Sequence, residues 1–168
     1  RVLFYDRLLS QDGSVACASC HEQDKGFSDD AVLSEGWDGG LTGRHSMSLI
    51  NVRWYASGRM FWDERAATLE DQVLMPIQDE VEMGLDLEEL IFRLEAAEHY
   101  APLFEAAFGD PVVTADRVSR ALAQFVRSIV STETRWDAAM AQTDDITGDL
   151  PGLTPQENRG KEIFFGQH

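Results

Sequence analysis

Residues 17–21 read Cys17-Ala18-Ser19-Cys20-His21, and this pentapeptide guides the interpretation of the rest of the chain. Two thiols separated by two residues and followed directly by an imidazole form the C-x-x-C-H pattern. In that pattern both cysteines bond to the vinyl groups of haem, and the histidine is delivered to the iron. The stretch therefore predicts one covalently held haem c, attached through Cys17 and Cys20, with His21 as the proximal iron ligand.

A thiol pair has two other uses, zinc binding and a redox-active disulfide. Zinc needs further ligands, but the chain has only two cysteines, and the remaining histidines, His45, His99 and His168, lack ligand spacing. A redox pair is typical of a strand and helix in an α/β unit, and no such pattern surrounds this motif. Haem is favoured over both.

Composition narrows the class of protein. The chain has 168 residues, 43% of them hydrophobic, with four Trp and nine Phe, which is typical of a folded domain. A formal net charge of −16 disfavours nucleic acid and anionic lipid as partners and favours basic proteins. No apolar run approaches the ~20 residues that cross a bilayer, so we expect no membrane span.

Turn-forming glycines are concentrated in the first 60 residues and predict short helices joined by long loops. From Phe61 onward the apolar spacing becomes helical, and Pro76 is expected to stop that helix. No alternating strand pattern of useful length is present. The predicted fold class is all-α.

Three further helix starts are visible. Asp86 and Glu89 form a capping-box-like start to a helix that should run to about Glu98. The strongest apolar stripe covers residues 115–131, with Thr114 as N-cap. After a polar loop, residues 154–157 (TPQE) combine an N-cap, a proline at the first helical position and a capping Glu. The chain stops inside that last helix, so we expect it to be a fragment.

Several blocks in a fixed order carry more information than the haem motif alone. They are residues 3–10 (LFYDRLLS), 17–21, 26–29 (GFSD), 61–72 (FWDERAATLEDQ), 76–78 (PIQ), 81–83 (VEM) and 121–128 (ALAQFVRS). This order resembles the bacterial di-haem cytochrome c peroxidase and MauG-like family, over essentially the whole chain. The resemblance implies a cytochrome c-like peroxidatic haem domain with long loops at residues 1–150. Residues 151–168 would be a linker and the first helix of a truncated second haem domain.

The resemblance also implies roles for three side chains. Trp62 matches the family tryptophan that lies between the haems, while Gln72 and Glu82 match polar residues on the distal side of the peroxidatic haem. Taken alone, Trp62 would be a core residue and the other two solvated surface residues. A carboxylate such as Glu82 could take a proton from one peroxide oxygen and deliver it to the other, and burial should raise its pKa. Gln72 could orient peroxide but cannot titrate.

The sequence departs from the family at the other axial position of the iron. Glu35 stands where many members have a loop histidine that blocks the peroxidatic iron, so we expect a five-coordinate or water-ligated haem. His45 is a competing ligand, although a loop residue with hydrogen-bonding duties is the preferred interpretation. His45 also falls where the family often has an Asn of an inter-haem calcium site, and imidazole is a poor calcium ligand, which argues against calcium.

Methionine is the remaining source of a sixth ligand. A thioether ligand would give an electron-transfer cytochrome, but scattered methionines usually fill cores. Of the four candidates, Met83 is the hardest to dismiss because it adjoins Glu82. The four are Met47, Met60, Met75 and Met83.

The leading functional hypothesis is a periplasmic haem c peroxidase domain that reduces hydrogen peroxide to water. Electrons would come from a small redox protein, such as a cytochrome c or cupredoxin, through the second haem domain of the same protein. A MauG-like oxidase of a protein or organic substrate and a non-catalytic electron carrier are the alternatives. The resemblance leaves a homodimer open, and covalent haem attachment implies an extracytoplasmic compartment.

Overall fold

The computed structural model describes residues 1–166, so His168 lies outside the described residues. The chain forms two compact units, one from Arg1 to Ile129 and one that begins at Val130. The division expected at residues 150 and 151 concerns the haem domains of the family and stays a prediction. Within residues 1–166 no helix is long and apolar enough to cross a membrane.

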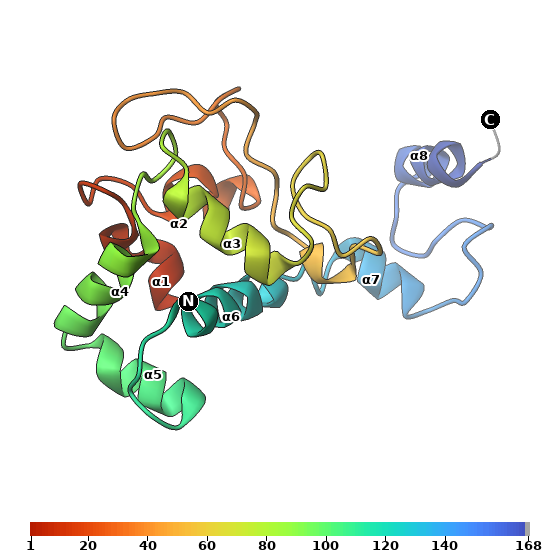
Figure 1. The fold of residues 1–168 in the computed structure, drawn as a ribbon. Helices are drawn as coiled ribbons and strands as arrows, with labels where there is room; N and C mark the ends of the chain where they lie inside the picture. The colour runs from red at the N-terminus through yellow and green to blue at the C-terminus, as the bar shows by residue number, and fades with distance from the viewer. Residues whose placement is uncertain (167–168) are drawn as a thin grey trace. The chain divides into compact units, whose positions relative to one another are not determined.

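The all-α prediction is confirmed: the chain is built from helices and long loops (Figure 1). Across residues 1–166, strand-like pairing is limited to three isolated bridges that close loops on themselves. They join Glu22 to Ser28, Glu35 to Leu41 and Met60 to Ala66. The longest loop region separates α2 (Cys17–Cys20) from α3 (Leu69–Gln78) and is interrupted only by two short 3-10 turns, η2 (Gln23–Lys25) and η3 (Val52–Trp54).

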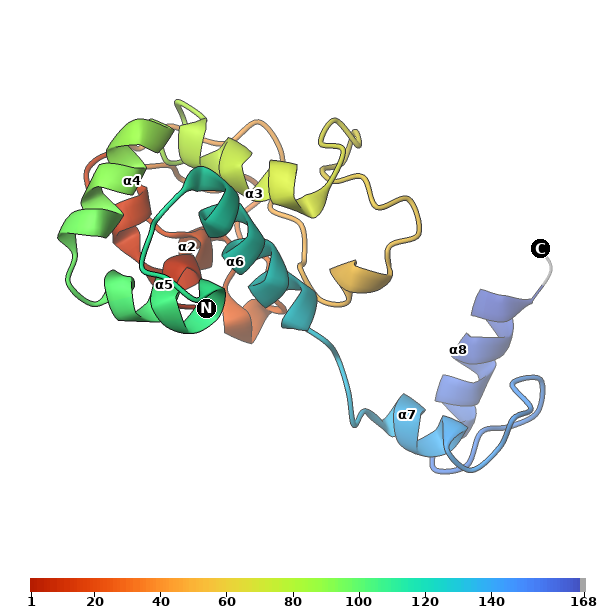
Figure 2. The ribbon, with the colours of Figure 1, turned by 60° about the horizontal axis from the view of Figure 1, so that its bottom comes forward.

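The core of the first unit lies between α3 and α6 (Ala115–Ser128), which run side by side in Figures 1 and 2. The predicted apolar stripe of α6 is buried and includes Val118, Leu122 and Val126. Thr114 caps the helix as expected, because its hydroxyl accepts from the Arg117 N–H at 3.2 Å. The helix ends three residues earlier than predicted.

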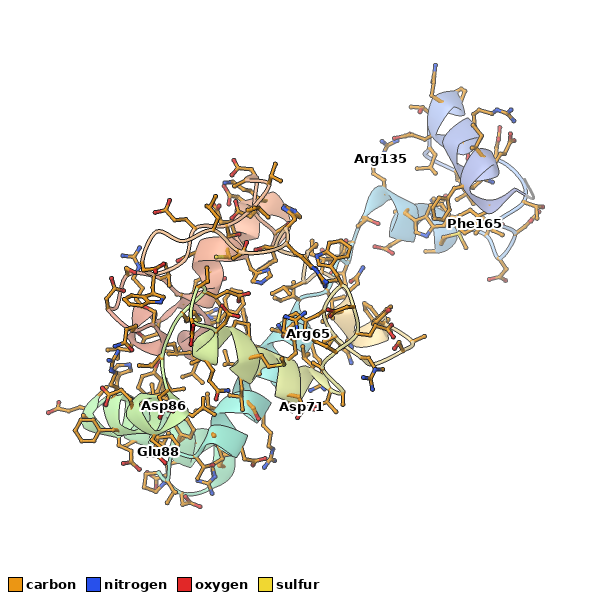
Figure 3. All side chains as sticks on the ribbon, turned by 45° about the horizontal axis from the view of Figure 1, so that its top comes forward. Arg65, Asp71, Asp86, Glu88, Arg135 and Phe165 are labelled. Atoms are coloured by element: carbon orange, nitrogen blue, oxygen red, sulfur yellow. The ribbon has the colours of Figure 1, made fainter. Side chains whose placement is uncertain are left out.

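The prediction that Pro76 stops its helix is wrong. The helix begins at Leu69, after the Thr68 side chain accepts from the Asp71 N–H, and it continues through Pro76 to Gln78. Figure 3 marks Asp71 in this first turn. Proline lacks an N–H, so α3 forgoes one helical hydrogen bond at Pro76. The expected helical start at Phe61 is also wrong, because residues 61–65 form a turn closed by the Met60–Ala66 bridge.

The helix predicted after Asp86 is α4 (Leu87–Ala96), whose start Figure 3 marks with Asp86 and Glu88. The Asp86 carboxylate accepts from the Glu88 N–H at 2.7 Å, which confirms the cap. Glu89 does not complete a capping box, because its carboxylate pairs with Arg93 one turn later at 2.7 Å. The helix ends at Ala96, two residues short of the expected end.

Three more elements complete the first unit. They are α1 (Val2–Tyr5), the 3-10 turn η1 (Arg7–Leu9) and α5 (Tyr100–Phe108). The sequence did not predict α5. It is joined to the chain start through the buried Tyr100, whose hydroxyl donates to the Asp6 carboxylate at 2.5 Å.

The second unit contains α7 (Arg135–Met140) and α8 (Pro155–Phe165), marked in Figure 3 by Arg135 and Phe165. The predicted capping box of α8 is present, with Thr154 and Glu157 bonded reciprocally. Those bonds and the Arg135 guanidinium lower the pKa of Glu157 to about 2. The cap motif was therefore sufficient to locate α8, whereas α7 was not predicted.

Candidate functional site

Cys17 and Cys20 occupy one turn, α2, where residues three apart share a face. The Ser19 hydroxyl starts this turn by accepting from the Ala16 N–H at 3.0 Å. Both thiols are free and half-buried. Burial raises the pKa of Cys17 to about 12 and also raises that of Cys20. Such thiols stay protonated at neutral pH, unlike the low-pKa thiols of redox-active pairs.

His21 follows α2 directly, and the next loop fixes its ring. The Nδ1 atom lies 3.1 Å from the Phe27 carbonyl oxygen, which makes Nε2 the nitrogen that would bind a metal, and the Met47 backbone also acts on this imidazole. Gly26 and Phe27 both have left-handed backbone conformations, with φ of 70° and 56°, which turn the chain back toward His21. Burial lowers the pKa of His21 and so favours the neutral imidazole that binds metals.

These residues fit haem c. Two free thiols on one face of a helical turn, followed by a neutral imidazole held through Nδ1, are the donor set that covalent haem needs. Zinc fits less well, because within residues 1–166 the thiols belong to no cluster of three metal-binding side chains. The one such cluster, Glu22 with Asp29 and Asp30, contains no thiol.

Glu82 lies in the turn after α3 and is half-buried. Burial raises the pKa of its carboxyl, the charge of Asp79 adds to that rise, and Arg65 opposes it. The charge of Glu82 in turn contributes to the raised pKa values of Cys17 and Cys20. Glu82 therefore lies within electrostatic reach of both thiols of the motif.

Gln72 and Trp62 lie on different parts of the first unit. Gln72 is half-buried within α3. Trp62 is 59% exposed and is not a core residue; its Nε1 donates to the His45 carbonyl at 2.9 Å. Beside it, the Arg65 guanidinium lies 3.5 Å from the centre of the Phe61 ring. Trp62 is therefore a surface aromatic tied to the His45 segment.

His45 and Glu35 are both occupied in loop structure. The two ring nitrogens of His45 lie 3.0 Å from the Ala31 carbonyl oxygen and 3.1 Å from the Ser28 hydroxyl. This arrangement fits the loop-residue interpretation of His45, because neither nitrogen is left for a metal. Glu35 is exposed at the base of a small hairpin that pairs it with Leu41.

Sequence reasoning missed two groups around the motif. One is the Phe27 carbonyl, which holds His21. The other is the hairpin after Ser34, where Trp37 donates from its backbone and its indole to carbonyls of the turn that carries Glu82.

Comparison with known proteins places this site in a family. The family profile described as "Di-haem cytochrome c peroxidase" matches residues 1–145. The chain belongs to the di-haem cytochrome c peroxidase family. Among members, it is 36% identical over 164 residues to methylamine utilization protein MauG of Methylophilus methylotrophus, covering 98% of this chain and 47% of that protein.

Two more members broaden the comparison. Cytochrome c551 peroxidase of Nitrosomonas europaea is 30% identical over 168 residues, covering 99% of this chain and 47% of that protein. A solved MauG-like protein associated with microbial copper homeostasis superposes with a TM-score of 0.81 at 32% identity, covering 98% of this chain and 47% of that chain. The chain thus spans about half the length of these family members. Haem c is the cofactor that the family implies, and the Cys17, Cys20 and His21 site fits it.

Proposed function

We propose that this chain is the peroxidatic haem domain of a di-haem peroxidase. The reaction consumes one hydrogen peroxide, two protons and two electrons and releases two waters. The observation that carries the proposal is the half-buried carboxyl of Glu82, whose pKa is raised and whose charge acts on both haem-motif thiols. A proton-transfer group beside a haem site is what peroxide cleavage requires.

Glu82 is the proton carrier in this proposal. Its carboxylate takes the proton from one peroxide oxygen and returns it to the other, which leaves as water. Burial supports this role, because a raised pKa lets the carboxyl hold the proton between the two transfers. Gln72 is proposed to orient peroxide. Haem, held by Cys17, Cys20 and His21, would supply the iron at which peroxide binds and through which electrons reach it.

We propose that no side chain blocks this iron. Glu35 offers no imidazole, and both nitrogens of His45 are engaged by Ser28 and Ala31. The haem would then be five-coordinate or water-ligated, and no loop rearrangement would precede peroxide binding.

The electron supply is proposed to come from a small redox protein, such as a cytochrome c or cupredoxin, through a second haem of the longer protein. Trp62 is the proposed residue for electron passage, because it is an exposed aromatic held by a hydrogen bond to the segment beside His21. Covalent haem attachment supports a periplasmic location.

The test of this proposal is Glu82→Gln in the complete protein that carries both haems. Glutamine keeps the size of the side chain but cannot carry a proton, so peroxide turnover should fall by roughly 10²- to 10⁴-fold. Glu105→Gln on the exposed surface of α5 is the matched control and should keep normal turnover. Normal turnover in the Glu82 variant would contradict the assigned role.

A MauG-like oxidase is the second candidate. It is supported by the 36% identity to MauG. Counting reduced donor molecules oxidised per peroxide separates the two functions. A peroxidase oxidises two one-electron donors for each peroxide consumed, whereas an oxidase would consume peroxide while oxidising a protein or organic substrate and leaving the donor reduced.

A further inference from the structure

The turn that carries Glu82 is closed from within by Asp79. One Asp79 carboxylate oxygen accepts from the Val81 N–H at 2.9 Å and from the Glu82 N–H at 3.1 Å. The Asp79 carbonyl accepts from the Gly84 N–H at 2.8 Å. These bonds use the N–H groups of Val81, Glu82 and Gly84, and the carbonyls of residues 80–82 face partners elsewhere in the chain.

Gly36 and Trp37 contact all three of those carbonyls. The Trp37 N–H donates to the Glu82 carbonyl at 3.2 Å, and the Trp37 indole N–H donates to the Glu80 carbonyl at 2.9 Å. Gly36 packs directly on the third carbonyl, that of Val81. A Cβ on Gly36 would lie only 1.6 Å from the Val81 oxygen, so no larger residue fits there without a shift of the backbone. Two adjacent residues therefore fix the backbone on both sides of the Glu82 side chain.

The indole of Trp37 also needs the glycine that ends the turn. A Cβ on Gly84 would lie 2.4 Å from Trp37 Nε1, and Gly84 has a φ of 66°, a conformation that favours glycine. Gly36 in the hairpin and Gly84 in the turn have no side chains, and this lets the two segments pack closely against each other.

The other end of the hairpin reaches the haem motif. Ser34 is buried, and its hydroxyl donates to the Asp29 carboxylate at 2.6 Å. The same hydroxyl acts on the Cys20 thiol and partly offsets the burial that raises the pKa of Cys20. The hairpin is closed by the Ser34 N–H, which donates to the Thr42 hydroxyl at 3.0 Å. One hairpin thus has Ser34, which acts on the Cys20 thiol, at its base and Trp37, which is bonded to the turn that carries Glu82, near its tip.

We propose that Gly36 and Trp37 are positioning residues that hold Glu82 at a fixed place relative to the haem-attachment cysteines. The inference rests on the proposed role of Glu82 and adds the residues through which the fold enforces it.

Cyanide binding to the ferric haem-loaded chain tests this proposal without turnover. Hydrogen cyanide must lose its proton as it binds, so a correctly placed base speeds association. Gly36→Ala should slow association by about tenfold to a hundredfold, because its Cβ must displace the Val81 carbonyl. Gly43→Ala in the same loop is the matched control, since its Cβ meets no atom within 4 Å, and its rate should not change.

Trp37→Phe is the second variant and guards against misfolding of Gly36→Ala. It keeps an aromatic ring but loses the bond to the Glu80 carbonyl, so association should slow in the same direction, by about tenfold. Trp54→Phe removes an exposed indole elsewhere and should leave the rate unchanged.

A double variant separates positioning from a general structural effect. In a Glu82→Gln background the base is already lost, so adding Gly36→Ala should slow cyanide association no further. An equal slowing in both backgrounds, or unchanged rates in both single variants, would overturn the positioning role. An unchanged rate in Glu82→Gln alone would instead contradict the proposed function.

Discussion

At the residue scale, burial favours the neutral form of three side chains of the site. It raises the pKa of Cys17 and of Glu82, and it lowers the pKa of His21. The motif residues could be predicted from the sequence because their chemistry depends on spacing within five residues. Gly36 and Trp37 could not, because their partners lie more than 40 residues away and are backbone carbonyls, which no side-chain pattern identifies.

The charges around Glu82 predict a pH dependence at this scale. A base works only when deprotonated. The peroxide reaction rate should therefore fall on the acid side of its pH profile (the acid limb) at a pH above the ordinary glutamate pKa of 4.5. Asp79→Asn removes a charge that raises this pKa but keeps the oxygen that accepts from the turn, and should move the limb to lower pH. Arg65→Gln should move it to higher pH. Rate–pH profiles of the three proteins check this, and shifts of the opposite sign would contradict it.

At the element scale, helix starts that were predicted from a capping residue were more accurate than helix ends, whereas the start predicted from apolar spacing at Phe61 was wrong. Thr114, Asp86 and Thr154 cap through a side chain to a nearby N–H, an interaction contained in a few residues. The end of α3 is followed instead by the turn at residues 79–84. This turn packs against Gly36 and Trp37 of the hairpin, which lie far away in the sequence. That packing is tertiary, so the local rule that proline stops a helix failed here.

The packing of α6 carries a stability prediction. Leu122 is fully buried on the face of α6 that forms the core, so Leu122→Ala should lower the free energy of unfolding by about 2–5 kcal/mol. Gln124→Ala on the exposed face of the same helix should change it by less than about 0.5 kcal/mol. Urea unfolding followed by circular dichroism measures both, and equal losses would contradict the assigned core.

At the scale of the whole molecule, the chain contributes one haem motif and spans about half the length of its family members. The fold class and the family could be predicted because helical periodicity and the ordered sequence blocks extend along the chain. The proposal of an open iron depends on where the loops place Glu35 and His45, and only the structure shows His45 engaged through both ring nitrogens.

The most direct test of the account is the spin state of the ferric haem-loaded chain, measured by electron paramagnetic resonance at neutral pH. An iron held by His21 and open or water-ligated opposite it should give a predominantly high-spin signal. A purely low-spin signal from an iron with two protein ligands would contradict the open site and favour an electron-transfer cytochrome.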